Sequence, residues 1–130
     1  MQFGYTIVYV SSVTEALVFY KEAFGFETRF LHESHQYGEL ETGTTVLAFA
    51  SHAMGAMNLD GQYQKADLNM APLGIELAFV TGDVASAYAR AVAAGAIPLK
   101  PPVEKPWGQL VAYVRAKEGS LIELCSPVEG

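Results

Sequence analysis

The fold is decided by the stretch YTIVYVSSV at residues 5–13, whose pattern returns as ELAFVTGDV at residues 76–84. Each copy is a short apolar run followed by two small residues that suit the start of a helix. A second matching pair follows at a similar distance, GTTVLAF at residues 43–49 and GSLIELC at residues 119–125. The sequence therefore predicts two copies of one module.

Each copy predicts the order βαβββ. Apolar residues spaced by three and four follow Val13 as far as Gly25, which indicates an amphipathic helix, and an alanine-rich helix is expected over residues 84–94. Strands are expected over residues 3–10, 28–33, 37–41, 44–51, 75–81, 98–104, 109–115 and 121–126. The fold class is thus α+β, with two βαβββ modules that form a curved sheet around a cavity.

The domain boundaries follow from the same pattern. A chain of 130 residues has the length of one domain. We expect a single domain over residues 1–130, with module 1 at residues 1–52 and module 2 at residues 75–130. The stretch between them, residues 53–74, has no clear period and is interpreted as a long connection.

Composition limits the classes of partner. Hydrophobic residues make up 51% and charged residues 17%, so we expect a folded globule, and the net charge of −6 disfavours nucleic acid and anionic membranes. No apolar run approaches the ~20 residues that span a bilayer, and residues 1–4 lack the pattern of a signal peptide, which predicts a cytoplasmic protein. The lone Cys125 provides neither an intrachain disulfide nor a cysteine metal cluster.

The two ends of the chain resemble the vicinal oxygen chelate superfamily. The resemblance lies in the opening strand and helix of residues 5–25, with their FY and FG dipeptides, and in the closing stretch of residues 106–124, which begins PWG. The superfamily includes glyoxalase I, extradiol dioxygenases, fosfomycin-inactivating transferases and bleomycin-resistance proteins. The resemblance implies the double βαβββ fold and leaves the chemistry open.

The resemblance also implies where a metal site would lie. In the metalloenzymes, one residue from the first and one from the last strand of each module converge on a divalent ion. The corresponding positions are Tyr5, Leu47 (or Ala48 after a one-residue slip), Glu76 and Glu123. Only the glutamates are ordinary ligands, and catalytic sites usually have at least three, so we expect no metal cofactor, with Glu76 and Glu123 as weak candidates. The histidines, His32, His35 and His52, fall outside these positions and are expected to be solvated or locally hydrogen-bonded.

The alternation of side chains along a strand then predicts the cavity face. With Tyr5, Glu76 and Glu123 turned inward, the cavity face also takes Ile7, Tyr9, Thr45, Leu47, Phe49, Ala78, Val80, Leu121 and Cys125. The opposite face, beneath the helices, takes Val8, Val10, Val46, Ala48, Leu77, Phe79, Ile122 and Leu124. The predicted ligand-binding residues are Tyr5, Tyr9, Leu47, Phe49, Glu76, Trp107, Arg115 and Glu123.

Two interpretations of the acidic and aromatic residues stay open. Each glutamate either bonds a tyrosine hydroxyl or a basic side chain such as Arg115, or it binds a cationic or hydrogen-bond-donating ligand. Trp107 is either a partly buried structural aromatic or a platform that stacks on a ligand. Bleomycin-resistance proteins have a similar Pro-Trp-Gly segment beside their drug-binding groove, which favours the second role for Trp107.

Three functions are compatible with these features. The first is a homodimeric binding protein of bleomycin-resistance type that sequesters an aromatic, cationic small molecule in a dimer cavity. The second is a glyoxalase-like lyase or isomerase, similar to lactoylglutathione lyase, that uses Glu76 and Glu123 as metal ligands or Glu123 as a general base. The third is a subunit of a larger interaction module. We expect a small-molecule ligand rather than nucleic acid or membrane, and the sequence favours the first function.

Overall fold

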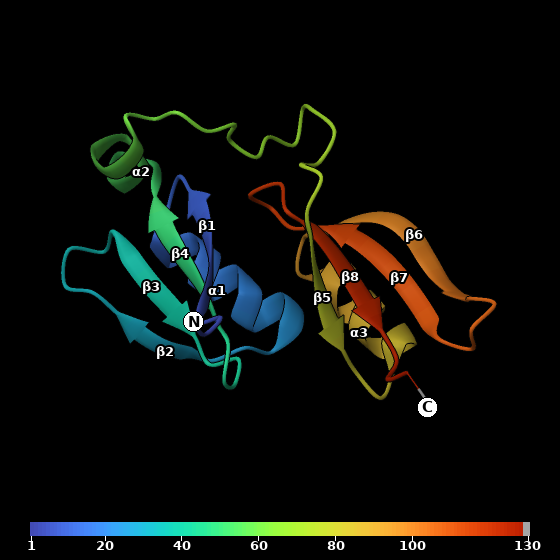
Figure 1. Cartoon of the computed structure of the whole chain (residues 1–130). Coiled ribbons are helices and arrows are strands. Elements are labelled where there is room, and N and C mark those ends of the chain that lie inside the picture. The colour runs from blue at the N-terminus through green and yellow to red at the C-terminus, as the bar shows by residue number, and fades with distance from the viewer. Residues whose placement is uncertain (129–130) are drawn as a thin grey trace. The chain divides into compact units, whose positions relative to one another are not determined.

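The computed structural model describes residues 1–128 and contains two compact units, residues 1–65 (unit 1) and residues 66–130 (unit 2). Each unit has a four-stranded sheet with a helix packed on one face (Figure 1). The division between the units falls inside the expected connection, residues 53–74.

The sheet of unit 1 has the strand order β1-β4-β3-β2. Strand β1 is parallel to β4, whereas β4, β3 and β2 are successively antiparallel. The elements of unit 1 are β1 (Tyr5–Val10), α1 (Val13–Phe24), β2 (Thr28–Leu31), β3 (Tyr37–Leu40), β4 (Val46–Ser51) and α2 (His52–Leu59).

Unit 2 repeats this arrangement in the strand order β5-β8-β7-β6. Here β5 is parallel to β8, and the other neighbours are antiparallel. The elements of unit 2 are β5 (Glu76–Val80), α3 (Val84–Ala93), β6 (Ile97–Glu104), β7 (Leu110–Arg115) and β8 (Leu121–Cys125). The matching topology confirms the predicted repeat of a βαβββ module.

Helices α1 and α3 begin and end close to where the sequence predicts. The side chains of Ser12 and Asp83 accept hydrogen bonds from the backbone N–H of Glu15 and Ser86, which satisfies donors that a helix N-terminus leaves free. Helix α1 stops at Gly25, whose φ of 81° lies in the left-handed region that favours glycine. Local sequence thus sets both modules in the same way.

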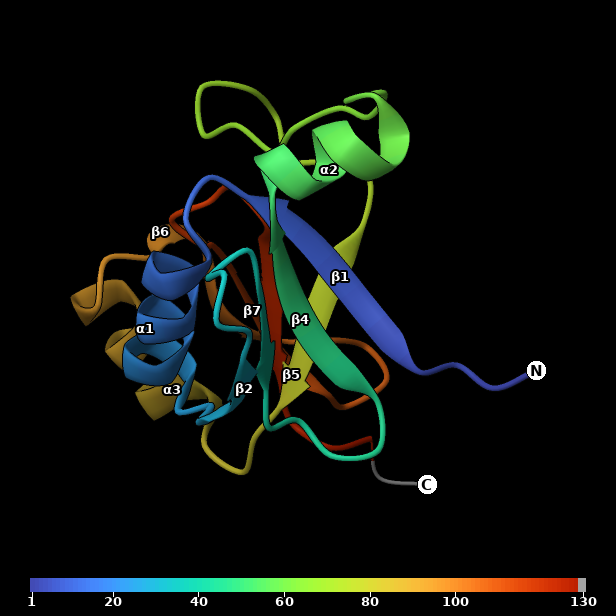
Figure 2. The ribbon, with the colours of Figure 1, turned by 90° about the vertical axis from the view of Figure 1, so that its left-hand side faces the viewer.

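The core of unit 1 lies between α1 and one face of its sheet, as the two layers in Figure 2 show. Tyr20 of α1 packs on Phe49 of β4 with ring centroids 4.8 Å apart. Gly38 of β3 lies directly beneath the helix, since a Cβ there would come within 2.8 Å of Leu17 Cδ1. The close approach of helix and sheet therefore depends on glycine at this position.

One element was not predicted. The segment expected to be an irregular connection begins with α2, capped by the Ser51 hydroxyl, which accepts from the N–H of Met54. The helix ends at Asp60, whose φ is 54°. With a glycine inside and little amphipathic contrast, the segment has no helical period to detect. None of the helices in residues 1–128 has the length and hydrophobicity required to cross a bilayer.

The predicted faces of β4 are wrong. The strand pairs place Ala48 beside Ile7, and Phe49 beside Val8 and Gly38. Leu47 and Phe49 therefore lie on the face beneath α1, and Val46 and Ala48 lie on the opposite face. The position in β4 that corresponds to Glu123 is thus Ala48, the alternative to Leu47 that the sequence left open. All six residues of β4 are buried, so the strand has no alternation from which its orientation can be inferred.

Candidate functional site

The face of each sheet that lies opposite its helix is called the open face here. In unit 2, the strand pairs place Ala78, Glu123 and Tyr113 in one row across this face. Glu76 lies on the same face, next to Leu121. The predicted orientation of the unit 2 strands is therefore confirmed, and the two glutamates are close neighbours on adjacent strands.

The two glutamates and Tyr113 form one polar cluster. The hydroxyl of Tyr113 donates to Glu123 Oε1 at 2.9 Å, and Glu76 and Glu123 share a hydrogen bond. Partial desolvation, followed by the charge of Glu123 and this hydrogen bond, raises the pKa of Glu76, although the residue stays exposed on the open face. The hydrogen bond to Glu123, followed by burial, raises the pKa of Tyr113 to about 12. The cluster can hold a proton between its carboxyl groups while Tyr113 remains a donor.

Cys125 borders this cluster on β8. Its side chain is buried, and its Sγ lies 3.8 Å from the carbonyl oxygen of Phe79. Burial, with the neighbouring Glu123, raises the pKa of the Cys125 thiol. The residue therefore contributes a neutral thiol to the open face and not a thiolate nucleophile.

Arg115 has a different environment from the one expected. The residue is buried, and four of the five guanidinium N–H groups donate to backbone carbonyls. Two of these bonds go to Gly119, one to Met70 and one to Asp67. Arg115 thus fastens the start of unit 2 to the β7–β8 turn and is largely occupied by the protein's own backbone.

Trp107 lies in the turn between β6 and β7. It is 63% exposed, and its indole Nε1 donates to Gln109 Oε1 at 2.8 Å. Gln109 is in turn held by the carbonyl of Ser126. The indole is therefore anchored by one edge and exposed, so it is not a core aromatic.

The open face of unit 1 is mainly aromatic. Tyr5 and Ile7 are exposed, and Tyr9 stacks on Tyr63 with ring centroids 4.7 Å apart. The Tyr63 hydroxyl and His52 Nδ1 are hydrogen-bonded at 2.8 Å, which ties the chain after α2 to unit 1. Burial, followed by the charge of Lys65, lowers the pKa of His52. Of the residues predicted for this face, Tyr5 and Tyr9 are on it, whereas Leu47 and Phe49 are in the core.

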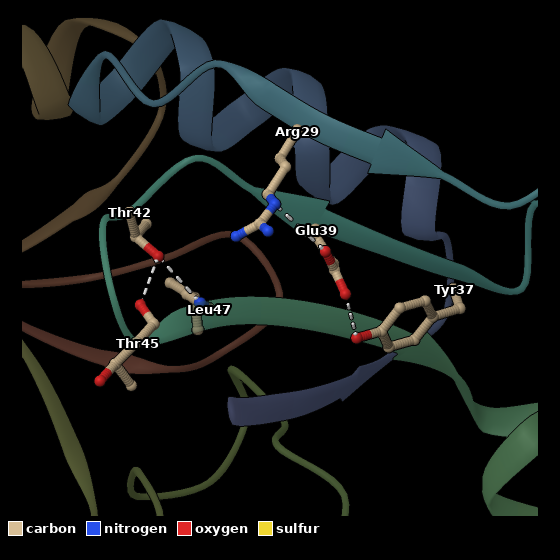
Figure 3. A network of polar contacts seen from close by, with 6 residues as sticks. All are labelled: Arg29, Tyr37, Glu39, Thr42, Thr45 and Leu47. Atoms are coloured by element: carbon tan, nitrogen blue, oxygen red, sulfur yellow. Dashed lines mark hydrogen bonds and ion pairs between the residues drawn. The ribbon is translucent and has the colours of Figure 1, made fainter. Parts of the chain in front are cut away.

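A carboxylate on this face was missed from the sequence. Glu39 lies between Tyr37 and Arg29 (Figure 3): the Tyr37 hydroxyl donates to Glu39 Oε2 at 2.8 Å, and Arg29 Nε is 3.8 Å from Oε1. Its strand partner is Ala48, so it occupies the open face. The alternation of Tyr37 and Glu39 on a predicted strand was the signal that could have identified it.

The turn beside Glu39 is held by a threonine. The Thr42 hydroxyl donates to the carbonyl of Thr45 and accepts from the N–H of Leu47, as Figure 3 also shows. These two bonds close the β3–β4 hairpin. They fix β3, and with it Glu39, against the central strand β4.

The donor groups of unit 2 do not suit a divalent transition metal. Its open face offers two carboxyl groups that bond each other, a tyrosine that is already a donor to Glu123, and a neutral thiol. The three histidines of the chain all belong to unit 1. Within either unit, the described residues form no group of three His, Cys, Asp or Glu side chains. The usual imidazole and carboxylate set is therefore not provided by unit 2 alone.

Comparison with family models identifies one superfamily that spans nearly the whole chain. Residues 2–124 match the family model described as the Glyoxalase/Bleomycin resistance protein/Dioxygenase superfamily. Among curated proteins, no relative matches the sequence.

Several solved structures have the same fold. A glyoxalase-related enzyme from Fulvimarina pelagi is 22% identical with a TM-score of 0.83. The alignment covers 98% of this chain and 88% of that enzyme's chain. A glyoxalase/bleomycin resistance protein/dioxygenase family enzyme from Burkholderia phytofirmans PsJN is 22% identical with a TM-score of 0.81, at 99% and 100% coverage. TioX from Micromonospora sp. ML1 is 20% identical with a TM-score of 0.71, at 97% and 98% coverage. At these identities the likeness shows the fold alone.

Proposed function

The chain belongs to the Glyoxalase/Bleomycin resistance protein/Dioxygenase superfamily, and from this premise we propose that it binds and sequesters an aromatic, cationic small molecule. The observation that carries the proposal is the Glu76–Glu123 pair on the open face of unit 2. Among the described residues, no Lys or Arg forms an ion pair with either glutamate. A positively charged ligand would supply the missing partner.

Exposed apolar and aromatic side chains support a ligand with a hydrophobic body. Val80 on the open face of unit 2 is 65% exposed, and Trp107 presents its indole in the same unit. Tyr5 and Ile7 are exposed on the open face of unit 1. Side chains of this kind bind planar or apolar groups, and Trp and Tyr also attract cations through their ring faces.

Titration calorimetry with a bleomycin-type glycopeptide and with a planar aromatic cation tests the proposal. Wild-type protein is expected to bind one of them with a dissociation constant below about 1 mM, a free energy beyond about −4 kcal/mol. Glu123→Gln keeps the size of the side chain and removes its charge, so binding should weaken about tenfold. Glu104→Gln, an exposed acid whose strand partner is Leu110, is the matched control and should bind like wild type. Binding by neither ligand, or equal weakening in both variants, would contradict the proposal.

The raised pKa of Glu76 favours a second candidate, an isomerase or lyase in which this carboxyl group transfers a proton. Glu123, hydrogen-bonded to Glu76 and to Tyr113, would hold the acid in place. The hemithioacetal of methylglyoxal and glutathione is the substrate to test first. Turnover by wild type that disappears in Glu76→Gln and persists in Glu104→Gln would favour the enzyme over the binding protein.

The proposed assembly is a homodimer in the cytoplasm that acts on a small molecule, without nucleic acid or membrane as a partner. The acidic composition supports the last point, because a net charge of −6 repels phosphate groups. Sedimentation equilibrium over a range of concentrations tests the dimer. A mass that stays at the monomer value of 14.0 kDa would refute it.

A further inference from the structure

The carboxylate of Glu39 in unit 1 is only partly satisfied. Its side chain is only 14% exposed. Among the described residues it accepts a single hydrogen bond, which the Tyr37 hydroxyl donates to Oε2 at 2.8 Å. Arg29 Nε lies 3.8 Å from Oε1, which is longer than a hydrogen bond. An ionised carboxylate has about four acceptor positions, so a largely enclosed one with a single hydrogen bond has capacity for another donor.

The unused oxygen is not completely buried. Among the described residues, every buried side-chain nitrogen or oxygen has a hydrogen-bond partner. Oε1 of Glu39 forms no hydrogen bond, so it is not sealed inside the unit. A donor group on a ligand can therefore reach this atom without unfolding the sheet.

Aromatic and apolar side chains lie near Glu39 on the open face. Phe30 is the strand partner of Glu39 on β2 and is 46% exposed, and its ring lies 6.4 Å from that of Tyr37. Ile7 lies in the same row of the sheet as Glu39, beyond Ala48. A carboxylate with aromatic neighbours on the same face is suited to a cation that has an apolar body.

Arg29 competes with such a ligand only weakly. Its side chain is 47% exposed and approaches Glu39 through Nε alone rather than through a bidentate pair (Figure 3). The pair contributes little, because solvent screens the half-exposed guanidinium and holding the long side chain in place costs it freedom. A ligand ammonium group can take the place of Arg29 at little cost.

We propose that Glu39, with the Tyr37 hydroxyl orienting it and Phe30 beside it, is a binding site in unit 1 for the ammonium group of an amine with an aromatic body. This site deepens the proposed function, on which it rests, by naming the ligand class as a primary aromatic amine in its protonated form. Its residues belong to unit 1, whereas the Glu76–Glu123 pair belongs to unit 2.

The test uses the full chain and 2-phenylethylammonium, with the neutral 2-phenylethanol as the matched probe. Calorimetry should show saturable binding of the amine, and two-dimensional NMR should show shifts of the Arg29, Tyr37 and Glu39 amides. Glu39→Gln should weaken binding about tenfold, and Arg29→Gln should strengthen it about twofold because the competing cation is gone. Glu33→Gln removes an exposed acid from the β2–β3 turn of the same unit and should bind like wild type.

Each result decides the proposal. Equal binding by wild type and Glu39→Gln, equal binding of the alcohol and the amine, or no saturable binding overturns it. If the Glu39→Gln spectrum shows an unfolded unit, the Arg29→Gln titration decides, since unchanged or weaker binding there overturns it. If Glu123→Gln weakens the binding of a bleomycin-type ligand whereas Glu39→Gln does not, the proposed function stands and this site does not.

Discussion

The open faces of the two units differ, although the scaffold beneath them is the same. Ala48 and Glu39 stand in one row of the unit 1 sheet, where unit 2 has Glu123 and Tyr113 at the matching places. In unit 1 the acid lies beside a base, Arg29, whereas in unit 2 the acid lies beside Glu76. The acid of unit 1 thus has a loosely placed basic neighbour, whereas the acid of unit 2 has a second carboxyl group beside it.

The helix-facing sides show why this divergence is possible. At matching places unit 1 has Gly38 and Phe49, and unit 2 has Ala112 and Leu124, all of them small or apolar. These residues hold the helix against the sheet and cannot become polar without loss of packing. The open faces are free of that requirement, so their chemistry can differ without a change of fold.

The largest expected effect is a difference in stability between variants of Arg115 in unit 2 and Arg29 in unit 1. Arg115→Ala should lower the free energy of unfolding by roughly 3 kcal/mol, because the buried carbonyl of Gly119 and the part-buried carbonyls of Met70 and Asp67 lose their donor. Arg29→Ala should cost less than about 1 kcal/mol, since its guanidinium is half exposed and lies beyond hydrogen-bond distance of Glu39. Urea unfolding of both variants measures the difference. Equal losses would show that Arg115 does not act as a clamp.

A medium effect is expected where the two helices meet their sheets. Gly38→Ala should cost roughly 1–3 kcal/mol, because the added Cβ meets Leu17 Cδ1 at 2.8 Å in a close-packed core. Ala112→Gly, at the matching place in unit 2, should cost about 1 kcal/mol from backbone freedom and lost burial. Thermal unfolding compares them. A Gly38→Ala protein as stable as wild type would show that helix and sheet are not in close contact in unit 1.

The smallest expected effect is a pH dependence that originates in unit 2. The pKa of Glu76 is raised above its ordinary 4.5, so the folded state keeps a proton that the unfolded chain has lost. This contribution is complete below pH 4.5 and disappears as the pH rises through the folded-state pKa. It is small, because Glu76 is exposed to solvent.

The stability of Glu76→Gln relative to wild type should therefore increase as the pH rises above 4.5. Urea unfolding at a series of pH values from about 4 to about 8 measures this difference. Glu104→Gln is the control, and its stability relative to wild type should not follow the same course. A difference for Glu76→Gln that is constant across this range would refute the coupling of the two carboxyl groups.

Much of the fold could be predicted because it depends on local patterns. The cap residues Ser12 and Asp83 and the stop at Gly25 define the helices, and alternating residues on β5 orient the acidic strand pair correctly. Helix α2 was missed because its sequence has no helical period. The orientation of β4 was wrong because a strand buried on both faces has no polar side to distinguish them.

The candidate site was predicted only in part, because some of its residues are recognised only by the contacts that they make with distant parts of the chain. Glu76 and Glu123 were singled out because the family resemblance implies that their positions converge, and the strand pairs place both on one face. Glu39 was missed because an acid in a short strand is ordinary until its neighbours are known. Arg115 was assigned to the ligand from its reach, and only the positions of Asp67 and Met70 show where its donors go.

The sequence by itself determined the repeated module, the boundaries of α1 and α3, the placement of Glu76 and Glu123 on one face, and the acidic balance of the chain. These follow from residue spacing and from each residue's own chemistry. The tertiary structure decided which face of β4 meets α1, what Arg115 holds, and that Glu39 has an accessible oxygen between Tyr37 and Arg29. Each of these depends on which strand lies next to which, and residues far apart in the chain supply the contacts.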